Sequence, residues 1–238
     1  MLTQWWQKNR QRFIAHYCQS CGLAIEARNA SNGLPWLLCL RCVTALQRPR
    51  CLSCGLEYQQ SIDYCGRCLT RPPNWRRLYC VGDYAPPLSS YVQQFKFSRQ
   101  LHQAELLAEL LLLNVEPNVE VITFVPLHWW RQFRRGFNQS EWIARALAKR
   151  LGIPCMALFK RARATQPQLG MTRSQRHKNL NNAFVINTYI DFNSVAIVDD
   201  VVTTGSTVNS LCKLLLDAGV KSVDIYTICR TPEPNGDR

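Results

Sequence analysis

Two adjacent carboxylates and a run of hydroxyl side chains stand close together near the end of the sequence. In VAIVDDVVTTGSTV, residues 195–208, four apolar residues precede Asp199 and Asp200. The polar turn that follows contains Thr203, Thr204, Gly205, Ser206 and Thr207. Hydroxyls and closely spaced N–H groups at a helix N-terminus bind a phosphate through hydrogen bonds and the helix dipole. Carboxylates beside such a turn can accept hydrogen bonds from ribose hydroxyls, so the stretch predicts a sugar-phosphate site. The alternative is an ordinary strand-to-helix turn with Ser206 as N-cap and solvated acids.

Eight of the 12 cysteines form four C-x-x-C pairs within the first third of the chain. The pairs are Cys18/Cys21, Cys39/Cys42, Cys51/Cys54 and Cys65/Cys68. Two-residue spacing lets both thiolates of a pair face one tetrahedral ion, and two pairs complete a Cys₄ site. The spacing therefore predicts two structural zinc ions, one on the first two pairs and one on the last two. Crossed pairing of the four C-x-x-C units stays open, and a redox role is the alternative.

Positive charge is concentrated in one segment of a chain whose net charge is +13. Residues 121–190 contain nine Arg and three Lys against one acid, Glu141. Because the guanidinium fork matches phosphate oxygens, this segment favours phosphate ligands over a merely solvated basic face. The arginines that we expect to contact phosphate are Arg131, Arg134, Arg135, Arg161, Arg163 and Arg176.

Aromatic and basic residues alternate in HWWRQFRRGF, residues 128–137. Rings that stack on bases, with arginines that follow the phosphates, are typical of single-stranded nucleic-acid binding. The candidates are Trp130, Arg131, Arg134 and Arg135. Core packing of the rings is an equal alternative, because Trp and Phe are mostly buried whatever their neighbours.

Strand and helix patterns alternate after residue 78. Strands are predicted at 78–84, 119–127, 155–159, 194–200 and 222–229, and helices at 88–113, 138–152 and 206–220. Residues 161–184 are predicted to be a long polar loop. This order predicts an α/β fold, a mostly parallel sheet covered by helices, whose ligands bind beyond the carboxyl ends of the strands. Asp199 and Asp200 occupy such a position.

The division of the chain follows from composition. Residues 1–70 hold the paired cysteines, residues 71–78 carry two prolines and three arginines and are predicted to be a linker, and residues 79–238 hold the α/β pattern. The longest apolar run, from Ala104, is interrupted by Glu105 and Glu109. It is shorter than the ~20 residues that span a bilayer, and the amino terminus has no signal-peptide pattern. We therefore expect a cytoplasmic protein without a transmembrane segment.

The carboxylate and hydroxyl stretch resembles the signature with which type I phosphoribosyltransferases bind phosphoribosyl pyrophosphate (PRPP). Together with VPLHWWRQFRRGFNQSEWIARALAKRLG, KRARATQPQLGMTRSQRHKNLNNAF and the cysteine pairs, it is similar to the ComF/GntX family. That family consists of phosphoribosyltransferase-like proteins associated with the uptake and use of DNA. The resemblance covers nearly the whole chain.

The resemblance implies a type I phosphoribosyltransferase-like sheet with helices on both faces, preceded by a double zinc ribbon. Asp199 and Asp200 would hold ribose and, indirectly, Mg²⁺, and residues 203–207 would hold the 5′-phosphate. Residues 126–135 would receive pyrophosphate, and residues 161–179 would cover the site. If the protein is an enzyme, the reaction is displacement at the anomeric carbon, with arginines that stabilise the leaving group.

Three functions stay open. In the first, the protein binds PRPP or a nucleotide and transfers its phosphoribosyl group to an acceptor, for which the sequence shows no recognisable pocket. In the second, it is a non-catalytic adaptor that binds single-stranded DNA. In the third, the cysteine module docks to the DNA-import machinery at the inner face of the membrane.

Overall fold

The computed structural model describes residues 16–25, 38–98, 101–127, 136–161 and 183–232. By its internal contacts the chain divides into two compact units, Met1–Gln47 and Arg48–Arg238. The first unit contains an antiparallel pair of short strands, β1 (His16–Tyr17) and β2 (Ala24–Ile25), and helix α2 (Leu40–Leu46). The first four cysteines of the C-x-x-C pairs lie in this unit.

A four-stranded parallel sheet forms the centre of the second unit. Its strands are β3 (Arg77–Asp83), β4 (Val121–Phe124), β7 (Ser194–Val202) and β8 (Ser222–Arg230), in the order β3-β8-β7-β4. Every neighbouring pair is parallel. All four residues of β4 and all but the first of β8 are buried, as expected for apolar strands covered on both faces. The predicted parallel α/β sheet is confirmed.

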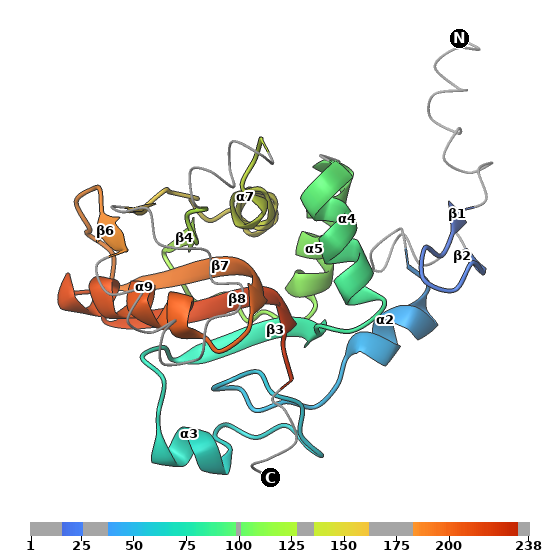
Figure 1. Cartoon of the computed structure of the whole chain (residues 1–238), viewed down its shortest axis with the longest axis horizontal. Helices are drawn as coiled ribbons and strands as arrows, with labels where there is room; N and C mark the ends of the chain where they lie inside the picture. The colour runs from blue at the N-terminus through green and yellow to red at the C-terminus, as the bar shows by residue number, and fades with distance from the viewer. Residues whose placement is uncertain (1–15, 26–37, 99–100, 128–135, 162–182, 233–238) are drawn as a thin grey trace. The chain divides into compact units, whose positions relative to one another are not determined.

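Helices cover both faces of this sheet (Figure 1). Helices α4 (Leu88–Ser98), α5 (Leu101–Leu112) and α7 (Gln139–Leu151) lie together on one face, and α9 (Ser206–Asp217) lies on the other. Side chains alternate between the faces along each strand, so Val195 and Ile197 of β7 share one core with Leu211 of α9. Strand β7 is therefore followed by a helix on the face opposite to α7.

Capping residues fix both ends of α7 at the positions predicted from the sequence. The Asn138 side chain accepts a hydrogen bond from the Ser140 N–H at 3.2 Å and donates one to the Val125 carbonyl at 3.0 Å. At the other end, Gly152 adopts φ 69°, a left-handed conformation that favours glycine. The contact with Val125 holds the start of α7 just beyond the carboxyl end of β4.

The predicted strand at 155–159 is wrong. Cys155 forms only an isolated bridge with Ile122, and the next strand, β5, begins at Phe159. The Ile122 N–H donates to the Pro154 carbonyl and the Ile122 carbonyl accepts from the Met156 N–H, so the chain follows the edge of β4 for a single residue. Strand β5 (Phe159–Arg161) then pairs antiparallel with β6 (Phe184–Ile186).

The β5–β6 pair joins the two ends of the predicted polar loop at 161–184, and residues 162–182 lie outside the described part.

Strand β7 runs past the predicted end at Asp200, because Val201 and Val202 pair with Cys229 and Arg230. The two acids therefore belong to the strand itself.

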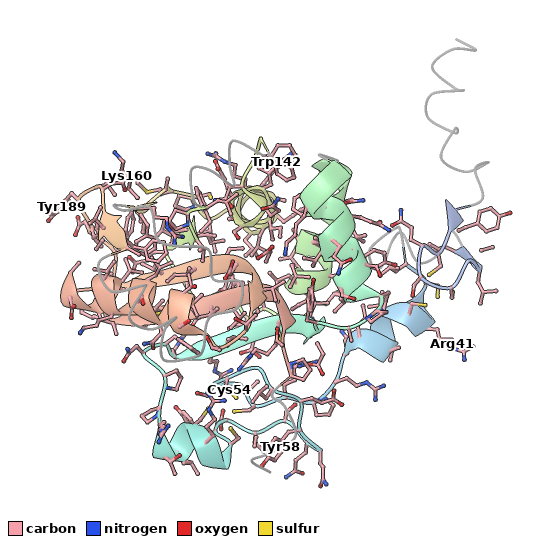
Figure 2. All side chains as sticks on the ribbon, viewed as in Figure 1. Arg41, Cys54, Tyr58, Trp142, Lys160 and Tyr189 are labelled. Atoms are coloured by element: carbon pink, nitrogen blue, oxygen red, sulfur yellow. The ribbon has the colours of Figure 1, made fainter. Side chains whose placement is uncertain are left out.

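The second set of cysteine pairs belongs to the same compact unit as the sheet. Its residues lie on the coil before α3 (Gly66–Thr70) and on that helix, and Figure 2 shows Cys54 on the coil beside β3. The Leu78 N–H of β3 donates to the Leu52 carbonyl at 2.8 Å, and the Cys80 thiol donates to the Gly55 carbonyl at 3.5 Å. The sequence instead grouped both sets in residues 1–70, with a linker at 71–78.

Residues of that predicted linker are fixed to the sheet. The Arg76 guanidinium forms a two-pronged ion pair with the buried carboxylate of Asp224, with N–O distances of 2.9 and 2.5 Å. Residues 77 and 78 already belong to β3. Among the described residues, no helix is both long enough and apolar enough to cross a membrane.

Candidate functional site

The two acids lie near the carboxyl end of β7, where the connection after β7 and the connection after β4 lead to opposite faces of the sheet. Helix α7, which follows β4, packs on β4 and β7, whereas the helix that follows β7 covers the other face. The connections from the carboxyl ends of β4 and β7 therefore diverge to opposite faces, and ligands of open α/β sheets bind at such a point. Asp199 and Asp200 lie in β7 near this end of the strand.

Asp200 forms an ion pair with a lysine that the sequence did not single out. The Lys96 ammonium of α4 lies 3.0 Å from the Asp200 carboxylate, and both side chains are about four-fifths buried, with exposures of 19% and 18%. The other carboxylate oxygen accepts the Val201 N–H at 2.8 Å. Because Lys96 lies 104 residues before Asp200 in the sequence and α4 shows no polar motif, only packing on the sheet brings Lys96 here.

Asp199 is held by two hydrogen-bond donors and lies beside a second acid. One of its oxygens accepts from the Ser140 hydroxyl at 3.1 Å and from the Asp200 N–H at 3.0 Å. Burial raises the pKa of Asp199 well above its ordinary value, and the neighbouring charge of Asp200 raises it further. These two donors and the charge of Lys96 oppose the rise without cancelling it. An arriving cation would reverse the balance and favour the ionised form.

Residues 203–207, which we call the phosphate loop, lead directly into α9. Gly205 adopts φ 77° and provides no side-chain cap for the helix. The hydroxyls of Thr204 and Ser206 lie 2.9 Å apart, and the Ser206 N–H donates weakly to Thr204 at 3.4 Å. First-turn N–H groups of a 12-residue helix thus lie beside two hydroxyls and two acids. This geometry is suited to an anionic phosphate group.

The predicted arginines fall mostly outside the described residues. Those outside are Arg131, Arg134, Arg135, Arg163 and Arg176, and Trp130 lies outside as well. Arg161 is described at the end of β5, where its guanidinium carbon lies 5.1 Å from the centroid of the Phe184 ring. Their predicted contacts with phosphate stay predictions.

Phe137, the last ring of the predicted aromatic and basic segment, belongs to the core. It is 5% exposed, and its ring centroid lies 5.4 Å from that of Phe95 and 4.8 Å from that of Trp142. The same cluster holds the start of α7 against α4, the helix that carries Lys96. For this ring the packing alternative is confirmed.

The cysteine pairs form two separate groups. The first group is Cys18, Cys21, Cys39 and Cys42, and the second is Cys51, Cys54, Cys65 and Cys68. All ligand atoms within a group lie within 4.8 Å of one another. The Cys21–Cys39 and Cys54–Cys65 sulfurs are each 3.7 Å apart. Four sulfurs arranged tetrahedrally around Zn²⁺ at ~2.3 Å are separated by about 3.8 Å, so both groups fit the ion. The predicted pairing is confirmed.

The two groups share the same turn geometry and differ in exposure. Gly22 and Gly55 both have φ 73°, and each donates its N–H to the carbonyl of the first cysteine of its pair at 2.8 Å. All four cysteines of the second group are buried, whereas Cys21 of the first group is exposed. Solvent and competing ligands therefore have easier access to the first group.

Interactions between the thiols of the second group shift the pKa values of two of its cysteines in opposite directions. A hydrogen bond from Cys54 lowers the pKa of Cys51 to about 4, although burial opposes this shift. The same bond, together with burial, raises the pKa of Cys54. The Cys65 N–H also donates to the Cys51 sulfur at 3.2 Å. A metal ion bound to this group would replace the thiol protons, because metal ligands are thiolates.

Comparison with known proteins identifies relatives across most of the chain. Residues 138–238 match the family described as the phosphoribosyl transferase domain. The DNA utilization protein YhgH of Escherichia coli is 41% identical over 207 residues, which cover 82% of this chain and 91% of that protein. Competence protein F of Haemophilus influenzae is 37% identical over 84% of this chain and 92% of its own length. Competence protein ComFC of Streptococcus pneumoniae is 22% identical over 90% of this chain and 87% of its own length.

Proposed function

The chain belongs to the ComF family, and from this premise we propose that it binds PRPP or a closely related sugar phosphate and takes part in the uptake and use of DNA. The observation that carries the ligand proposal is the junction of β7 and α9. Two acids, two hydroxyls and the uncapped start of a helix meet there at the carboxyl end of a central parallel strand.

Each part of the ligand has a complementary group in this arrangement. The 5′-phosphate binds the N–H groups and hydroxyls of the phosphate loop, and the ribose hydroxyls donate to Asp199 and Asp200. Lys96 turns from Asp200 toward pyrophosphate oxygens, since an ammonium interacts with either anion. When Mg²⁺ is bound together with PRPP, it supplies a hard cation for pyrophosphate and ribose oxygens.

The proposal for the cysteine groups is that each holds one structural zinc ion. Four thiols at tetrahedral separation are the usual ligands of such a site. The DNA role rests on the names of the relatives, which describe DNA utilization and competence. With this role we place the protein in the cytoplasm, where imported DNA and PRPP meet.

Isothermal titration calorimetry with PRPP and Mg²⁺ tests the ligand proposal. Asp200→Asn should weaken binding by about tenfold or more, because hydrogen bonds to charged groups contribute about 1.5–3 kcal/mol. Thr204→Val should weaken binding by a smaller factor, since it removes one neutral donor. Asp217→Asn, at the exposed end of α9, is the matched control and should bind as the unaltered protein does. Equal affinity in all four proteins would move the ligand to another site.

A second candidate, a DNA-binding adaptor that retains the fold without transferring a phosphoribosyl group, is favoured by the same family names. This adaptor differs from an active phosphoribosyltransferase in that it does not turn over PRPP. Release of pyrophosphate from PRPP in the presence of nucleobases, amines or DNA supports the enzyme. PRPP binding without pyrophosphate release under any of these conditions supports the adaptor.

A further inference from the structure

The turn between two cysteines of the second group contacts side chains that also reach the phosphate loop. Cys51 and Cys54 are separated by Leu52 and Ser53, and the carbonyls of Ser53 and Cys54 each accept a hydrogen bond from a side chain outside the turn. The donors are Trp75 and Arg230. All of these residues belong to the Arg48–Arg238 unit.

Arg230 connects the turn with the start of the phosphate loop. Its Nε donates to the Cys54 carbonyl at 2.9 Å, and one terminal nitrogen donates to the carbonyls of Val202, at 3.3 Å, and Thr203. The residue is 3% exposed. A buried guanidinium bonded to backbone carbonyls of both segments opposes their separation, because hydrogen bonds to a charged group are costly to lose inside a protein.

Trp75 makes the second connection. Its indole N–H donates to the Ser53 carbonyl at 2.7 Å. The far edge of the same ring lies so close to Gly205 that a Cβ at that position would be 3.1 Å from ring carbon Cη2. Gly205 precedes α9 with φ 77°, so the ring packs on the residue that sets the direction of the helix start.

Backbone hydrogen bonds from the Gly55 and Leu78 N–H groups help to hold the turn, but its apolar packing is small. The local core of the second group consists of its four cysteines with Leu56 and Ile62 packed against them. In so small a cluster, metal binding supplies much of the folding free energy. An ion that draws the four thiolates together therefore adds to the forces that position the Ser53 and Cys54 carbonyls.

We propose that Trp75 and Arg230 are positioning residues that couple metal occupancy of the second cysteine group to phosphate binding at residues 203–207. Loss of metal from this group relaxes the phosphate loop, whereas loss of metal from the first group does not. This inference rests on the proposed function, because it takes the phosphate loop as the ligand site. By linkage, a ligand on the loop also raises the affinity of the second group for metal. We expect this higher affinity to appear as slower metal release.

Hydrogen exchange in the metal-loaded full chain tests the mechanical connection without any ligand. Amides of residues 203–207 should exchange about fivefold faster or more in Arg230→Lys and Trp75→Phe, the lower end of typical site-to-site couplings. The matched control is Arg50→Lys. Arg50 is 8% exposed and donates to the Gly55 carbonyl of the same turn, but its other partner is Asp83. Amides of β4 report any general loss of stability and should be unchanged.

Zinc release to a colorimetric chelator tests the linkage. Saturating PRPP with Mg²⁺ should slow release from the second group about fivefold or more and leave the first group unaffected. The Cys21→Ser variant assigns the two phases, since it lacks a complete first group. Arg230→Lys and Trp75→Phe should lose the slowing, and Arg50→Lys should keep it. A residue with a purely structural role would not remove this ligand effect.

The outcomes separate this inference from the proposed function. Unchanged exchange at residues 203–207 in both variants overturns the coupling, whether or not PRPP binds. If PRPP binds but slows zinc release equally in all variants, the coupling is also overturned. If calorimetry shows no PRPP binding, the proposed function fails, and faster exchange at residues 203–207 in both variants still supports the mechanical connection.

Discussion

Asp199 and Asp200 are adjacent near the end of β7, but their carboxylates have different partners. Asp200 is paired with Lys96 and bonded to one backbone N–H, so its charge is balanced before any ligand arrives. Asp199 has two neutral donors and a like-charged neighbour, and its pKa is raised by burial first and by Asp200 second. Ionisation of Asp199 is therefore unfavourable in the folded protein, and a bound cation would favour the ionised form.

At the residue scale we predict that Asp199→Asn stabilises the folded protein at neutral pH. With a raised pKa, native Asp199 binds its proton more tightly than the unfolded chain does, so its contribution to stability is lost as the pH rises through that raised value. The asparagine variant lacks this loss and should melt about 2–4 °C higher, the shift that about 1 kcal/mol produces in a protein of this size.

Thermal melts across pH provide the measurement. The gain should shrink as the pH falls below the ordinary carboxyl value of about 3.9, because Asp199 is then protonated in both the folded and the unfolded protein. Asp217→Asn should leave the melting temperature unchanged at every pH. A lower melting temperature for Asp199→Asn at neutral pH would show that its hydrogen bonds outweigh the cost of its charge.

The sequence predicted the residues that adjoin each other along the chain and missed those that packing brings in. The acid pair and the TTGST turn were recognisable because β7, the loop and α9 are consecutive. Lys96 and Ser140 reach Asp200 and Asp199 from α4 and α7, and nothing in a local pattern indicates that two helices converge on one strand end. Trp75 was assigned to packing, and its hydrogen bond to Ser53 depends on a turn far away in sequence.

At the scale of elements, the two cysteine groups look alike in sequence and differ in what surrounds them. Both have the C-x-x-C-G turn, but the second group packs on β3 through Leu78 and Cys80. Periodicity predicts strands and helices because it reports burial of a face. It does not report which compact unit a coil with paired cysteines joins, and so the predicted division at 70 and 71 differs from the contact division at 47 and 48.

This difference predicts unequal effects of the same substitution in the two groups. Cys65→Ser should lower the melting temperature of the Arg48–Arg238 unit, because the second group is buried against its sheet. Cys21→Ser should leave that transition in place, since Cys21 belongs to the other unit and is exposed. Differential scanning calorimetry, with metal content measured on the same samples, distinguishes the two. Equal shifts would mean that the two groups stabilise one cooperative unit.

Over the whole molecule, positive charge is concentrated in residues 121–190, and such a segment favours phosphate-bearing ligands, both PRPP and the DNA that the family's role implies. If residues 131–135 follow a nucleic-acid strand, single-stranded DNA should bind more tightly than duplex. The logarithm of affinity should fall linearly with the logarithm of salt concentration, with a slope of about −0.7 for each phosphate contacted.

Fluorescence anisotropy on labelled oligonucleotides measures both the affinity for each DNA form and its dependence on salt concentration. Replacing Arg134 and Arg135 with alanine should flatten the salt slope, whereas Trp130→Ala should weaken binding by about 1–3 kcal/mol at every salt concentration if a base stacks there. Arg145→Ala, on the exposed face of α7 where it pairs with Glu141, is the control. Equal affinity for both DNA forms and no salt slope would exclude direct DNA binding through this segment.

A crystal structure of the protein with PRPP and Mg²⁺ tests whether the β7–α9 junction binds PRPP. We expect the 5′-phosphate on the N–H groups and hydroxyls of residues 203–207, the ribose hydroxyls on Asp199 and Asp200, and Lys96 turned away from Asp200. Ligand density elsewhere on the molecule, with the Lys96–Asp200 pair intact and the phosphate loop empty, would contradict it.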